Sequence, residues 1–96
     1  MMFDEFIRKE SITVNNVDIE VHTISAKERQ NFSQFIQETP GKALTHAAWL
    51  VKYGTEKYKG MEVDALLDMP DYALLQISEA VIKVSGIGKK PKAGAE

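Results

Sequence analysis

The sequence predicts an α+β domain in which an N-terminal β-hairpin packs against a mainly α-helical bundle of four to five helices. Between residues 11 and 22 apolar residues alternate with polar ones, which is the period of strands. From residue 25 onward they recur three and four residues apart, which is the period of amphipathic helices. The 96 residues suffice for one domain. We place a single globular domain at residues 1–87 and expect a flexible C-terminal tail at residues 88–96, which has no apolar periodicity.

The first element expected is a short amphipathic helix of about two turns. Phe3, Phe6 and Ile7 have helical spacing and stand beside charged residues. So short a helix is marginal by itself, because nucleation is costly.

The hairpin is predicted from its turn as well as from its strands. Asn15-Asn16 separates the two alternating runs, and asparagine tolerates the positive φ that a type I′ turn demands at both central positions. A two-residue turn sets the register and brings the apolar residues opposite each other on one face: Val14 with Val17, and Ile12 with Ile19. A two-stranded hairpin is not stable alone, so helices or another subunit must cover this face.

Helix boundaries follow from capping signals. Ser25 and Glu28 have the spacing of a capping box, which begins a helix. Thr39-Pro40-Gly41 ends that helix, and we expect Thr39 to cap the next one with Pro40 at its first position. Gly54 offers a left-handed stop to this second helix.

Two further helical segments are expected after a polar loop at residues 54–60. The first is short and apolar, over residues 63–67. The second follows Pro70, carries a broad apolar face and ends at Gly86.

Composition and charge exclude several classes of function. The 12 basic side chains are balanced by 14 acidic ones and form no stripe, so specific nucleic-acid binding is not expected. The absence of cysteine removes disulfides, thiolate nucleophiles and sulfur metal sites. His22 and His46 have no local partner, and no serine lies in a nucleophile motif. We therefore expect no enzyme, and no catalytic, metal or cofactor-binding residues.

Membrane insertion and secretion are not expected either. The N-terminal residues are acidic where a signal peptide would be basic, and no apolar run approaches the roughly 20 residues needed to span a bilayer. A reducing cytoplasm is the natural compartment.

Protein binding is the class of function that remains. Aromatic residues are favoured at interfaces, although in a small domain they lie in the core as often. The hairpin face and the broad last helix offer much apolar surface for a narrow domain to cover. The candidate interface residues are Leu44, Trp49, Tyr53, Leu75 and Ile82.

The order of these parts resembles the tail assembly chaperones of long-tailed bacteriophages, over roughly residues 3 to 88. The matching pieces are the opening Phe-Asp-Glu-Phe-Ile, the hairpin from Ile12 to Val21, the segment from Ile24 to Arg29, the segment from Val63 to Pro70, and the closing segment from Ala80 to Gly88. Two features differ from the family pattern. Asn16 stands where relatives often have glycine, and the loop before Met61 is shorter.

The resemblance implies a non-enzymatic protein of the host bacterial cytoplasm that is absent from the mature virion. Members of this family bind and solubilise the tape measure protein and help the major tail tube protein to polymerise around it. The resemblance also implies a homo-oligomer, and association with a longer form made by programmed ribosomal frameshifting near Gly88-Lys89-Lys90.

Two other interpretations stay open from the sequence. A virion structural protein, such as a small head-tail connector or tail component, would also oligomerise but would remain in the particle. A small regulatory or toxin-neutralising protein would bind nucleic acid in a strongly salt-dependent way.

Overall fold

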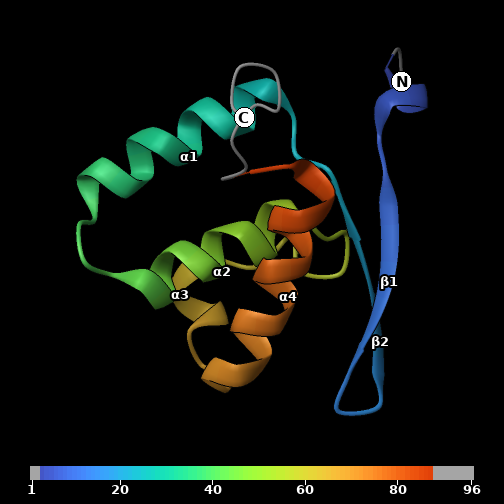
Figure 1. Cartoon of the computed structure of the whole chain (residues 1–96). Coiled ribbons are helices and arrows are strands. Elements are labelled where there is room, and N and C mark those ends of the chain that lie inside the picture. The colour runs from blue at the N-terminus through green and yellow to red at the C-terminus, as the bar shows by residue number, and fades with distance from the viewer. Residues whose placement is uncertain (1–2, 88–96) are drawn as a thin grey trace, which may run out of the picture.

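The structure is a computed structural model that describes residues 3–87, in which a two-stranded antiparallel hairpin packs against four helices (Figure 1). The predicted α+β fold is confirmed. The predicted tail at residues 88–96 lies outside the described residues. The elements, in chain order, are a 3-10 turn η1 (Asp4–Phe6), strands β1 (Lys9–Val14) and β2 (Val17–His22), and helices α1 (Ala26–Glu38), α2 (Ala43–Tyr53), α3 (Val63–Leu66) and α4 (Asp71–Ser85).

The hairpin has the predicted turn and the predicted register. Asn15 and Asn16 have φ values of 51° and 67°, as a type I′ turn requires. The strands pair Val14 with Val17 and Ile12 with Ile19. Val14, Ile19 and Val21 are buried on one face, and α4 covers this face of both strands. The helical layer thus supplies the cover that a lone hairpin needs.

The N-terminal segment is shorter as a helix than we predicted. The expected two-turn amphipathic helix is a single 3-10 turn, Asp4–Phe6, and β1 already begins at Lys9. Pairing of Lys9 and Glu10 with β2 holds these residues in extended backbone, so no second helical turn can form.

Helix α1 begins with the predicted capping box. Ser25 Oγ accepts a hydrogen bond from the Glu28 amide at 3.1 Å, and Glu28 Oε1 accepts one from the Ser25 amide at 2.9 Å. Both side chains therefore satisfy amides that would have no partner within the helix.

The prediction that Thr39 caps the second helix is wrong. Thr39 is instead the C-cap of α1, and its hydroxyl donates to the Phe35 carbonyl at 2.6 Å. The chain then turns at Gly41, which has a φ of 78°, and α2 begins at Ala43 rather than at Pro40. The hydroxyl also lies 2.9 Å from His46 Nε2 within α2, and no side chain caps the start of α2.

Gly54 does end α2, but not in the predicted left-handed conformation, since its φ is −100°. A Cβ at this position would lie 2.5 Å from Val81 Cγ1 and 2.8 Å from the Leu50 carbonyl oxygen. Close packing against α4 therefore requires glycine here. Gly86 ends α4 as predicted, and it has a left-handed conformation with a φ of 72°.

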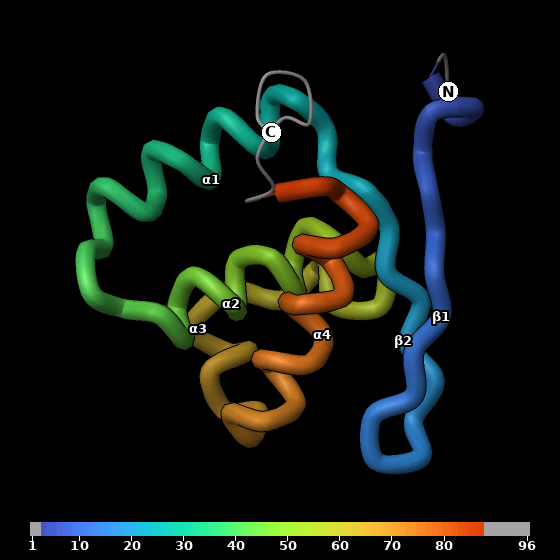
Figure 2. The backbone as a smooth tube through the Cα atoms, viewed as in Figure 1, coloured from blue at the N-terminus to red at the C-terminus, as the bar shows by residue number. Residues whose placement is uncertain are grey.

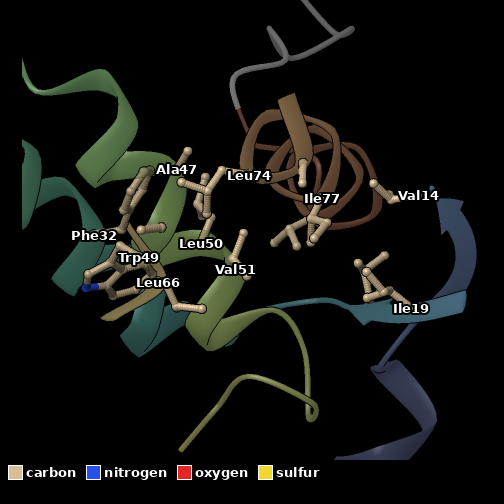
Figure 3. Packing of buried hydrophobic residues seen from close by; sticks show 14 residues of the cluster. Val14, Ile19, Phe32, Ala47, Trp49, Leu50, Val51, Leu66, Leu74 and Ile77 are labelled. Carbon is tan, nitrogen blue, oxygen red and sulfur yellow. The ribbon is translucent and has the colours of Figure 1, made fainter. Parts of the chain in front are cut away.

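The core lies between the hairpin, α2 and α4. Figure 3 shows Ile77 of α4 between two groups of side chains, Val14 and Ile19 of the hairpin on one side and Leu50 and Val51 of α2 on the other. Leu66 of the short helix α3 is also buried. The chain path in Figure 2 brings the end of α4 back to the connection between β2 and α1, where the Ile24 amide donates to Ser85 Oγ at 3.2 Å.

None of the helices in the described part of the chain has the length and hydropathy that a bilayer crossing requires.

Candidate protein-binding surface

An open groove of about 690 Å³ lies beside the N-terminal turn. One wall consists of Phe3, Phe6 and Ile7. The connection from β2 to the start of α1, which includes Ile24 and Ala26, also lines the groove. Three segments that are apart in the sequence thus form one groove, with residues 56 and 59 of the polar loop completing its lining.

The wall formed by the N-terminal turn is strongly exposed. Phe3 is 61% and Phe6 is 71% exposed, although each carries a large apolar ring. The turn is held in place by hydrogen bonds between Arg8 and Thr23, in which the Arg8 amide donates to the Thr23 hydroxyl and the Arg8 carbonyl accepts from the Thr23 amide. Two rings are therefore presented to solvent on an anchored segment, which is typical of a contact surface.

Charged residues around the groove are mainly acidic. Four carboxylate residues line it against two lysines: Asp4, Glu20, Glu28 and Glu56, with Lys9 and Lys59. A bound segment with apolar side chains and flanking basic residues would match both the walls and the charge.

His22 also lines this groove. Its Nδ1 is 2.9 Å from the Thr23 carbonyl oxygen, to which it donates. Its Nε2 lies 3.6 Å from a carboxylate oxygen of Glu56 and makes no hydrogen bond. The ring is thus held by its own strand end.

His46 joins the end of α1 to α2. Its Nε2 lies 2.8 Å from the Thr39 carbonyl oxygen, and its ring packs edge-on against Phe32 and Phe35. Among residues 3–87 no group of three or more His, Asp or Glu side chains has a geometry that would hold a metal ion.

The structure places the five candidate interface residues in different environments. Leu44 of α2 and Leu75 of α4 are each 41% exposed and accessible to a partner. Tyr53 and Ile82 are half-buried at the edge of the core. Trp49 is buried, with its ring between Phe32, at a centroid distance of 5.0 Å, and Tyr53, at 4.2 Å. Trp49 therefore packs the core and is not part of the exposed surface.

Sequence reasoning did not select the most exposed aromatic residues, Phe3 and Phe6. Their spacing predicts only a short amphipathic helix, without indicating what its apolar face contacts. Helical spacing marks an apolar face but does not show what covers it, so the sequence alone could not separate exposed rings from packed ones here.

Comparison with known proteins found no family model, no curated protein and no solved structure that matches this chain.

Proposed function

We propose that this protein is a non-enzymatic phage tail assembly chaperone, which binds and solubilises the tape measure protein and assists tail tube polymerisation. The proposal is supported by the order of sequence elements from the opening Phe-Asp-Glu-Phe-Ile to Gly88. The observation that carries it in the structure is the groove walled by Phe3, Phe6 and Ile7.

The physical basis is the burial of apolar surface. A long helical chain with apolar stripes aggregates when the stripes stay bare, and a chaperone must cover them while remaining dissolved. Fully burying an aromatic or aliphatic side chain stabilises a complex by about 1.5–3 kcal/mol. The exposed rings of Phe3 and Phe6 can contact the apolar face of a helical segment. The acidic residues that line the groove complement basic residues on either side of that face.

Co-expression tests this proposal directly. The neighbouring tape measure protein is produced in the bacterial host with and without this chain, and its soluble fraction and co-purification are measured. We expect the tape measure protein to stay in solution only when the chain is present. No gain in solubility and no co-purification would contradict the proposal.

The groove is tested separately with the double variant Phe3→Ser/Phe6→Ser. Because both rings are exposed, we expect unfolding stability to stay near the wild-type value while solubilisation is lost. Val17→Thr is the matched control, since Val17 is 44% exposed but lies outside this groove. If the double variant solubilises the tape measure protein as well as the control does, the groove is not the binding surface. Leu44 and Leu75 are then the next positions to change.

Mass spectrometry of purified virions separates the assembly factor from a virion component. We expect the chain to be absent from mature particles. Stoichiometric amounts in the particle would favour a head-tail connector or tail component instead.

A further inference from the structure

The hairpin has one covered edge and one open edge. On the outer edge of β2 the His22 amide donates to the Gly54 carbonyl at 2.9 Å, and Val21 forms a bridge with Thr55. Across residues 3–87, no strand pairs with the outer edge of β1. Figure 1 shows the hairpin standing beside α4, at the side of the molecule away from α1. The outer edge of β1 is therefore available for strand pairing.

The register identifies which backbone groups point outward from β1. In a two-residue hairpin the residues next to the turn exchange hydrogen bonds, and this inward pairing recurs at every second residue. Val14, Ile12 and Glu10 thus point their amides and carbonyls toward β2. The bond from the Thr23 amide to the Arg8 carbonyl continues the same alternation. The amides and carbonyls of Lys9, Ser11 and Thr13 consequently point outward.

We propose that β1 pairs antiparallel with β1 of a second copy of this chain, with Ile12 opposite Ile12 of that copy. In this register Ser11 and Thr13 of one copy exchange hydrogen bonds with Thr13 and Ser11 of the other. The two hairpins form a four-stranded sheet in the order β2-β1-β1-β2 with two-fold symmetry. This inference concerns a different surface from the groove and does not depend on the proposed function.

Side-chain matching along β1 favours a second copy as the occupant. Ile12 is half-buried on the helix-facing side, and pairing with itself extends the apolar face across the two-fold axis. Glu10 then lies opposite Val14, and Lys9 opposite Asn15, so no like charges are opposed.

A different register would be less favourable. With Ser11 on the axis, the same outward groups could still bond, but no two apolar side chains would be opposed, since each Ile12 would face Glu10 and each Val14 would face Arg8. The strand also contains no proline and no bulge, which are devices that proteins use to block an open edge.

Single-cysteine variants test the register, because the chain contains no cysteine of its own. In the proposed pairing the two Ile12 positions form a non-hydrogen-bonded pair with Cα atoms about 4.5 Å apart, within reach of a disulfide. The two Ser11 positions lie roughly 8 Å apart, which is too far for a disulfide. We expect Ile12→Cys to give a covalent dimer on mild oxidation and Ser11→Cys to stay uncrosslinked. Efficient crosslinking through Ser11→Cys, or through neither variant, would overturn the proposal.

A backbone variant tests the pairing without changing a buried residue. Thr13→Pro removes an outward amide that bonds nothing within the described chain, and edge strands tolerate proline where the amide faces outward. Thr13→Ala is the matched control, because both variants lose the hydrogen bond from Thr13 Oγ1 to Asp18 Oδ1 at 2.8 Å.

The readout is molar mass by light scattering over a concentration series, with circular dichroism to verify folding. We expect the wild type and Thr13→Ala to reach at least twice the chain mass of 10.8 kDa. For Thr13→Pro we expect the dimer dissociation constant to rise at least about tenfold. A wild type that stays monomeric, or a folded Thr13→Pro that associates like Thr13→Ala, would refute the pairing.

Discussion

Gly54 ends α2 against the side chain of Val81 in α4. Val81 is fully buried and belongs to the core. A methyl group at residue 54 would overlap both γ-carbons of Val81 and press on the Leu50 carbonyl. The absence of a side chain at residue 54 therefore allows α2 and α4 to pack this closely.

We therefore predict that Gly54→Ala lowers the free energy of unfolding by about 1–3 kcal/mol, the usual cost of overpacking a dense core. Urea unfolding of the variant and the wild type measures this change in the free energy of unfolding. Gly60→Ala is the control, because a Cβ there meets nothing within 4 Å. Equal stability of the two variants would mean that α2 and α4 can separate without cost.

The hairpin turn gives a second prediction for a single residue. Asn16 has a φ of 67°, a conformation that costs a residue with an ordinary side chain about 1–2 kcal/mol. Asn16→Ala should lower the free energy of unfolding by about 1 kcal/mol, whereas Asn16→Gly should match or exceed the wild type. Urea denaturation curves compare the three proteins. An alanine variant as stable as the glycine variant would argue against the type I′ turn.

At the scale of the element, α1 depends more on its own ends than the other long helices do. Phe32 is its only buried residue, whereas α2 and α4 each bury five. Its start is held by the reciprocal bonds of Ser25 and Glu28, and its end by Thr39 and His46. Local hydrogen bonds therefore matter more to α1 than burial does.

Ser25→Ala should destabilise the protein by about 1 kcal/mol, the typical loss for a serine N-cap. Ser33→Ala, at an exposed position within the same helix, should be neutral or slightly stabilising because alanine favours helix. Thermal and urea unfolding distinguish them, and hydrogen exchange in the first turn of α1 should quicken only in Ser25→Ala. No difference between the variants would mean that the cap bonds contribute nothing in solution.

The whole molecule is held by one core to which the hairpin and the helices contribute. α4 contacts β1, β2 and α2, so separating the hairpin would uncover α4 as well. A chain of this size with a shared core is expected to unfold in a single step.

Trp49 reports on this cooperativity, because it is the one tryptophan in the chain and is buried. We predict that its fluorescence and the far-ultraviolet circular dichroism change with the same midpoint in urea. A separate, earlier transition by circular dichroism would show that part of the molecule melts independently of the ring cluster around Trp49.

Features that depend on neighbouring residues were predicted from sequence alone. The Asn15-Asn16 turn, its register, the Ser25 capping box and the end of α4 at Gly86 are examples. Each is decided by backbone conformation or hydrogen bonds within a few residues, so the chemistry that sets it is visible in the printed sequence.

Features decided by contacts between distant segments were not predictable in this way. Thr39 is a residue type that often caps the start of a helix, but its hydroxyl donates to the Phe35 carbonyl of the preceding helix, α1. Gly54 was expected to turn left-handed, but it is needed for the approach of Val81. Among the candidate contact residues, Leu44 is exposed and Trp49 is buried, although both lie on α2 with similar apolar character. Periodicity marks an apolar face, but only the packing of the other elements decides which part of that face remains open.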